Sequence, residues 1–241
     1  MNTALIFAGG SGIRMNAKAR PKQFLELNGR AIIIHTLEYF ENHPEIDNIC
    51  VVCITNWIDH LKELLEHHRI KKVQWVVEGG SSGQESIYNG LKVIYANCKS
   101  PKDSVVLVHD GVRPLISEQL ISDNIASVRT HGSAITVTPA VETIVTAENG
   151  NQVERIADRS VCRLARAPQS FFLADLYEVH QKAVEDGIFN TIDSASLMKH
   201  YGHPLFMVDG PVENIKITTP MDFYLFRAIY EARENSQIFG I

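Results

Sequence analysis

The chain has 241 residues, of which 45% are hydrophobic and 21% charged, a composition that suits one globular domain with a buried core. Its net charge of -5 argues against nucleic-acid binding, which needs a basic surface. The first apolar run is too short for a signal peptide, and no stretch reaches the length of a membrane span. We therefore expect a cytoplasmic protein that does not associate with membranes.

The first half of the chain alternates short apolar runs with amphipathic segments. The apolar runs predict buried strands near residues 4–8, 49–54, 73–77 and 105–108. The amphipathic segments predict helices near residues 32–40, 58–67 and 85–95. This alternation is typical of βαβ units, so we expect an α/β fold with a Rossmann-like, mostly parallel sheet flanked by helices. Ligands of such sheets bind at the carboxyl ends of the strands, where the loops 9–23, 78–83 and 109–114 fall.

Two cysteines, Cys50 and Cys53, have the spacing of a metal or redox pair. They lie inside the second apolar run, and residues at this spacing on a strand face opposite sides of the sheet. We expect ordinary buried thiols, which fits a reducing cytoplasm.

The pattern changes after Ala134, where β-rich segments at residues 134–137 and 143–146 precede Asn149-Gly150, a hairpin signal. The strands of this hairpin are polar and offer little core-facing surface. We expect an inserted β-arm, residues 141–163, that protrudes from a single domain of residues 1–241 and packs on a second subunit. Helices are predicted near residues 173–185, 195–201 and 220–235, and short strands near residues 205–208 and 215–218.

The first strand runs into a glycine-rich loop, residues 9–15, which a basic segment with Pro21-Lys22-Gln23 follows. Glycines let backbone N–H groups approach an anion, and Arg14 and Lys22 add positive charge beside them. The loop lacks the third glycine of a dinucleotide site, since Met15 stands there, and it lacks the Gly-Lys-Ser/Thr ending of a P-loop. The whole pattern is typical of nucleotidyltransferases that join a sugar phosphate to a nucleoside triphosphate.

A buried strand delivers Asp110 to the ligand-binding edge of the predicted sheet. A buried carboxylate is costly unless it is paired or bound to a metal, and Mg²⁺ commonly takes one or two carboxylates plus substrate phosphates. Asp110 is therefore the predicted metal ligand. Arg113 either pairs with Asp110 or meets a second anionic substrate, and His109 is interpreted as a hydrogen-bonded structural residue rather than a base.

Two further segments carry candidate residues. Gly80 and Ser86 belong to a glycine loop after a strand, where backbone can approach a ligand closely and a hydroxyl can contact a pyrimidine edge. The alternative is only a helix start, capped by Ser81 or Ser82. Lys216 lies within an apolar run, so we expect an anion rather than solvent to hold it.

The motifs Ala-Gly-Gly-x-Gly-x-Arg-Met, Pro-Lys-Gln-Phe, Gly-Gly-…-Ser, His-Asp-Gly-Val-Arg-Pro, Ala-Pro-Gln-Ser-Phe and Asn-Ile-Lys-Ile-Thr-Thr-Pro occur in this order over nearly the whole chain. Together they resemble the cytidylyltransferases that make CDP-polyols, a family with 2-C-methyl-D-erythritol 4-phosphate and ribitol-5-phosphate branches. The resemblance implies CTP and a polyol phosphate as substrates, Mg²⁺ as cofactor, and a homodimer whose arms complete each other's sites.

Mapped by motif, the resemblance also implies a role for each candidate residue. The catalytic cations would be Arg14, Lys22 and Lys216. The nucleotide would contact Ala8, Gly9, Gly10, Gly12, Gly80 and Ser86. Asp110 would bind Mg²⁺, and the polyol phosphate would contact Arg113, together with Thr143 and Arg159 from the arm of the other subunit.

The chain departs from the family pattern at Gly83, where an arginine is usual, and at Ala167 and Ile192, where threonines are usual. These changes concern the acceptor rather than the chemistry. Gly9-Gly10 and the Pro-Gln-Ser-Phe motif resemble the ribitol branch, so we expect CMP transfer from CTP to D-ribitol 5-phosphate. The alternative acceptor is 2-C-methyl-D-erythritol 4-phosphate. Within the same enzyme class, the rival hypothesis is a uridylyl- or sugar-1-phosphate transferase. Two hypotheses come from other classes: a nicotinamide-dependent reductase, which the missing third glycine opposes, and a non-catalytic nucleotide-binding subunit, which the retained Asp110, Lys22 and Lys216 oppose.

Overall fold

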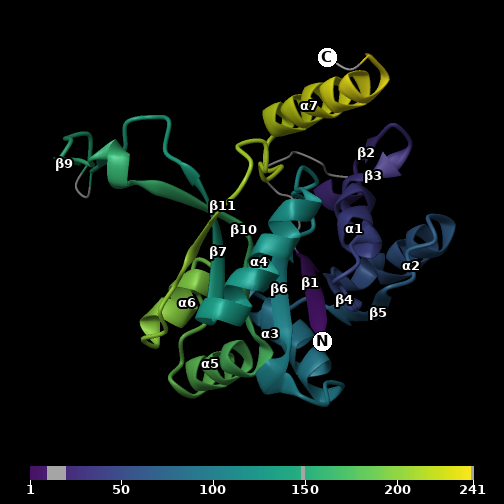
Figure 1. Cartoon of the computed structure of the whole chain (residues 1–241), viewed down its shortest axis with the longest axis horizontal. Helices are drawn as coiled ribbons and strands as arrows, with labels where there is room; N and C mark the ends of the chain where they lie inside the picture. The colour runs from purple at the N-terminus through teal and green to yellow at the C-terminus, as the bar shows by residue number, and fades with distance from the viewer. Residues whose placement is uncertain (10–19, 148–149, 240–241) are drawn as a thin grey trace.

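The computed structural model describes residues 1–9, 20–147 and 150–239 of the chain. A seven-stranded sheet forms its centre, with the strand order β11-β7-β10-β6-β1-β4-β5 (Figure 1). Its strands are β1 (Asn2–Ala8), β4 (Asn48–Cys53), β5 (Val73–Glu78), β6 (Val105–Asp110), β7 (Ser133–Pro139), β10 (Arg163–Phe172) and β11 (Met207–Asp209). The pairs β1–β4, β1–β6, β4–β5 and β7–β11 are parallel, which confirms the predicted mostly parallel sheet. Only β10 among these strands runs antiparallel, to both β6 and β7.

Helices cover both faces of the sheet. They are α1 (Ile32–Asn42), α2 (Ile58–His67), α3 (Gly83–Ala96), α4 (Glu118–His131), α5 (Leu173–Glu185), α6 (Ser194–His200) and α7 (Pro220–Phe239). All of the predicted helices are present, and α4 and β10 are additional elements that the sequence analysis did not identify. No helix in the described part of the chain has the length and apolar character that a bilayer span requires.

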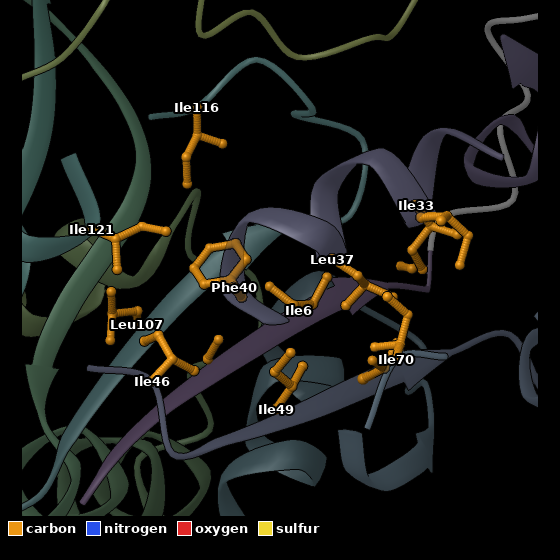
Figure 2. Close-up of a cluster of buried hydrophobic side chains, with 14 of the residues drawn as sticks. Ile6, Ile33, Leu37, Phe40, Ile46, Ile49, Ile70, Leu107, Ile116 and Ile121 are labelled. Carbon is orange, nitrogen blue, oxygen red and sulfur yellow. The ribbon is translucent and has the colours of Figure 1, made fainter. Parts of the chain in front are cut away.

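The strands divide their apolar side chains between two cores. In β1, Ile6 faces the core that α1, α2 and α4 cover, and Leu5 faces the core beneath α3, α5 and α6. Figure 2 shows the first core, where Phe40 and Leu37 of α1 lie over Ile6. Because neighbouring residues on a strand point to opposite faces, a sheet covered on both sides needs apolar runs rather than alternation.

The cysteine pair divides in the same way. Cys53 belongs to the first core and Cys50 to the second, and both are fully buried. Burial raises the pKa of Cys50 to about 12 and that of Cys53 to about 11, so both remain thiols. The prediction of inert buried cysteines is confirmed.

The predicted strand at residues 215–218 is wrong. Ile217 donates its N–H to the Val112 carbonyl (2.9 Å), but the segment joins no ladder. Ile217 is fully buried against Phe226 of α7. The apolar alternation therefore reflects packing of a loop beneath α7 rather than strand pairing.

A β-hairpin projects from the sheet (Figure 1). Its strands β8 (Val145–Thr146) and β9 (Arg155–Ile156) pair antiparallel, so the predicted hairpin forms, although Asn149 of its predicted turn lies outside the described residues. A second short antiparallel pair, β2 (Glu26–Leu27) and β3 (Arg30–Ala31), lies ahead of α1.

Candidate functional site

A cavity of about 410 Å³ lies at the carboxyl end of β6, between β10 and the first turn of α3. Its charged lining consists of Asp110, Arg113, Arg166, Asp193 and Lys216. This is the edge of the sheet at which the sequence pattern predicts ligand binding.

Asp110, at the end of β6, accepts two charge-assisted hydrogen bonds. Lys216 Nζ lies 2.6 Å from one carboxylate oxygen, and Arg113 Nε lies 2.7 Å from the other. Burial alone would raise the pKa of Asp110, but Lys216 and Arg113 outweigh it and lower that pKa to about 2. The carboxylate is ionised at neutral pH, and the expectation that an anion holds Lys216 is met by Asp110.

Arg113 is fixed from two sides. Its Nη1 donates to the Asn214 carbonyl (2.8 Å), and the Asn214 side chain donates to the Ala167 carbonyl (2.6 Å). Asn214 is fully buried and joins the loop before α7 to β10. Asn214 opens the Asn-Ile-Lys-Ile-Thr-Thr-Pro motif, and no role was predicted for it; its position two residues before Lys216 was the available signal.

His109 is fully buried, and its Nε2 donates to the Arg113 carbonyl (3.1 Å). Burial, more strongly than any neighbouring charge, lowers the pKa of His109 to about 4, so the ring is neutral at neutral pH. A neutral ring engaged with backbone fits the structural role expected from the sequence.

The glycine loops after β1 and β5 meet. A Cβ on Gly9 would lie 3.1 Å from Ser86 Oγ, and a Cβ on Gly79 would lie 3.5 Å from the Gly9 Cα. Ser86 Oγ accepts from the Gly80 N–H (3.0 Å) and donates to the Ser82 carbonyl (2.8 Å), which leaves one acceptor position on the hydroxyl. Ser82 also caps the N-terminus of α3, so the helix start that was predicted as the alternative for this loop is present.

The Pro-Lys-Gln turn is anchored to β1 by a residue whose role the sequence analysis missed. Gln23 is 1% exposed and donates to the Ala8 carbonyl (2.6 Å). Lys22 precedes it and is partly exposed. Gln23 therefore holds Lys22 beside the carboxyl end of β1, whereas Gly10, Gly12 and Arg14 lie outside the described residues.

The two arm residues lie apart from this cavity. Thr143 and Arg159 are exposed and do not line it, and Arg159 donates to the Val141 carbonyl (2.8 Å). The arm also exposes apolar side chains, with Ile156 at 66% and Val161 at 76%. Within one chain, therefore, the structure does not bring the arm to Asp110.

All of the positions that depart from the family pattern, Gly83, Ala167 and Ile192, line the cavity. Near them, Asp193 accepts from the Gln169 side chain (2.8 Å) and caps α6 through the Ser196 N–H (2.8 Å). The sequence differences thus fall in the cavity that Asp110 also lines.

Comparisons with known proteins identify a family and several similar chains. The family model described as IspD, 2-C-methyl-D-erythritol 4-phosphate cytidylyltransferase, matches residues 2–232. A ribitol-5-phosphate cytidylyltransferase of Vibrio parahaemolyticus is 52% identical, and one of Streptococcus agalactiae is 49% identical, each over the full length of both chains.

A solved structure is similar over the same span. The crystal structure of 4-diphosphocytidyl-2C-methyl-D-erythritol synthase from Anaerococcus prevotii superposes with a TM-score of 0.81 at 28% identity, covering 95% of this chain and 96% of that one. The fold is therefore shared with that enzyme, and the sequence similarity to the relatives extends over the whole chain.

Proposed function

The chain belongs to the 2-C-methyl-D-erythritol 4-phosphate cytidylyltransferase family, and within this family of nucleotidyltransferases we propose that it transfers CMP from CTP to D-ribitol 5-phosphate. An oxygen of the acceptor phosphate bonds to the α-phosphorus of CTP, the bond to the β-phosphate oxygen breaks, and pyrophosphate leaves. The acceptor phosphate is already ionised at neutral pH, so the reaction needs no general base.

The observation that carries the proposal is the ion pair between Asp110 and Lys216, which lies in a cavity that Arg113 also lines. One N–H of Lys216 is engaged by Asp110, and its side chain is still 37% exposed, so its other N–H groups can meet a phosphate. We assign Lys22, Lys216 and Arg14 to the charge that develops on the phosphates, where fixed cations are most effective. The Gly9, Gly80 and Ser86 loops would hold the nucleotide.

Cytidylyltransferases of this family are metal-dependent, and we infer that Mg²⁺ is the metal. The described residues contain no cluster of three or more metal-ligating side chains, so Asp110 would be a single protein ligand. That fits Mg²⁺, which often takes one carboxylate and completes its shell with substrate phosphates and water. Each Asp110 oxygen has accepted one hydrogen bond and retains a further lone pair. When bound, Mg²⁺ would supply charge neutralisation at the phosphates.

The inserted arm, residues 141–163, is proposed to act across a homodimer. A two-stranded hairpin is marginal alone, and this one exposes Val145, Val153 and Ile156. In a C2 dimer each arm would reach the site of the partner, where Thr143 and Arg159 would hold the acceptor phosphate.

The alternative acceptor is 2-C-methyl-D-erythritol 4-phosphate, which the matching family model and the similar crystal structure favour. The full-length relatives at about 50% identity favour ribitol 5-phosphate instead. A pyrophosphate-release assay with CTP and a panel of polyol phosphates tests the choice. We expect the highest kcat/KM with D-ribitol 5-phosphate and little turnover with UTP; a higher kcat/KM with methylerythritol phosphate would reverse the assignment.

A further inference from the structure

Arg166 is a cation of the cavity to which neither the sequence pattern nor the proposed mechanism gives a role. It lies on β10, which runs antiparallel to β6 with Gln169 opposite Val108. Residues ahead of Gln169 therefore extend past the carboxyl end of β6, where Asp110 lies. The register of β10 against β7 also shifts between Ala165 and Gln169, an irregularity of the kind that redirects side chains beside active sites.

The guanidinium of Arg166 has no carboxylate partner among the described residues. Its Nε contacts Thr138 Oγ1 at 3.4 Å, a long hydrogen bond. The other cations of the cavity, Arg113 and Lys216, both pair with Asp110, whose single negative charge offsets only one of their two positive charges. Burial, and then the charge of Arg113, lower the pKa of Arg166, so its surroundings disfavour its charge. A half-buried cation beside another cation is costly unless an anion joins it.

The position of β10 indicates which substrate supplies that anion. The predicted nucleotide loops follow β1 and β5, which lie on one side of β6, whereas β10 and β7 lie on the other. Ala167 and Ile192, which depart from the family pattern, line the cavity together with Arg166. A ligand on this side of Asp110 is the second substrate rather than the nucleotide.

We propose that Arg166 binds the phosphate group of the acceptor and so helps to determine which phosphorylated acceptors the enzyme accepts. The proposal rests on the proposed function for the identity of the reaction. A planar guanidinium can hold two phosphate oxygens at once, whereas an ammonium acts as a point charge. Arg166 is then an acceptor-binding residue that acts within its own chain, unlike the residues of the arm.

The test compares Arg166→Gln, Arg166→Lys and the control Arg227→Gln, a surface arginine of α7 that pairs with Glu231 outside the cavity. The acceptor is whichever polyol phosphate the wild-type enzyme uses best, so failure of the ribitol assignment does not decide the outcome. We expect Arg166→Gln to raise KM for the acceptor roughly 10- to 100-fold, the range for a hydrogen bond to a charged group, with KM for CTP within about twofold of wild type. The KM of Arg166→Lys for the acceptor should fall between the values of wild type and Arg166→Gln, and both KM values of Arg227→Gln should match wild type.

Calorimetric titration of the acceptor into the enzyme with a non-reacting CTP analogue gives a second readout. We expect Arg166→Gln to weaken acceptor binding while circular dichroism stays unchanged; if this variant fails to fold, Arg166→Lys carries the comparison. An equal rise in KM for CTP would assign Arg166 to the nucleotide and overturn the proposal. Unchanged KM values together with a weakened dimer in sedimentation would assign it to a subunit contact and also overturn it.

Discussion

Lys216 and Asp110 are joined by a 2.6 Å contact between Nζ and Oδ1, which ties the loop before α7 to the end of β6. The contact gives one carboxylate two tasks. Asp110 orients Lys216, which lines the cavity, and in the proposed mechanism its remaining lone pairs would bind Mg²⁺.

Lys22→Ala should lower kcat at least ~100-fold, the effect of losing one charge contact to the transition state. Gln23 holds the turn through Ala8, so the substitution should leave the fold unchanged. Steady-state kinetics with saturating CTP and acceptor measure the effect, and Lys99→Ala, at an exposed loop position, is the matched control. A normal kcat in the pure variant would remove Lys22 from the site.

Asp110→Asn should abolish Mg²⁺-dependent activity. The amide keeps a hydrogen-bond acceptor but loses the charge that pairs Lys216 and Arg113, so we also expect a lower Tm. Activity is measured across a Mg²⁺ titration, and circular dichroism checks the fold. If the variant keeps the Mg²⁺ dependence of wild type, the metal ligand lies elsewhere.

Arg159→Ala should raise KM for the polyol phosphate and barely change KM for CTP, because the arm is proposed to hold the acceptor phosphate and is distant in sequence from the nucleotide loops. At acceptor concentrations far below the raised KM, where each variant alone has little activity, mixing Arg159→Ala and Lys22→Ala subunits should restore activity, since one site of each heterodimer then has both residues intact. Subunits exchanged by mild denaturation and refolded together are the sample. Heterodimers that stay inactive would show that Arg159 does not act across the dimer.

Stability should fall with acidification between about pH 6.5 and pH 4, partly through His180. Burial lowers the pKa of His180 to about 4, and its Nε2 has no hydrogen-bond partner among the described residues. A group whose folded pKa is depressed contributes its full stability above its unfolded pKa, and loses it as the pH falls toward the folded value.

Urea unfolding at several pH values measures this effect in wild type and in His180→Leu. The free energy of unfolding of His180→Leu should fall less between pH 7 and pH 4.5 than that of wild type. His200→Asn, at an exposed position, should keep the wild-type slope. Equal slopes in wild type and His180→Leu would exclude His180 as a source of the pH dependence.

The parallel half of the fold could be predicted from sequence because its strands are buried on both faces. Apolar runs such as residues 49–54 cannot be amphipathic helices or solvent-facing strands. The amphipathic helices between these runs then give the alternation of strand and helix that is typical of βαβ units. The antiparallel β10 was missed because Pro168 interrupts its pattern, and proline is unusual within a paired strand. A local pattern also cannot distinguish a strand from a buried loop, and the error at 215–218 has that origin.

The site was predictable where a residue type is costly without a partner. Asp110 at the end of a buried strand and Lys216 in an apolar run each required an opposite charge, and the fold supplies each with the other. Asn214 and Gln23 were not predictable in the same way, because an amide that bonds backbone leaves no periodic signal. The position of Arg166 in the cavity depends on the irregular register of β10, which cannot be predicted from the sequence alone.

Direct competition between acceptors tests the central claim, CMP transfer to D-ribitol 5-phosphate. The enzyme receives CTP, Mg²⁺ and equal concentrations of D-ribitol 5-phosphate and 2-C-methyl-D-erythritol 4-phosphate, and mass spectrometry quantifies both CDP products at low conversion. The product ratio equals the ratio of the two kcat/KM values. We expect CDP-ribitol to predominate; a predominance of the methylerythritol product, or no CDP product from either acceptor, would contradict CMP transfer to D-ribitol 5-phosphate.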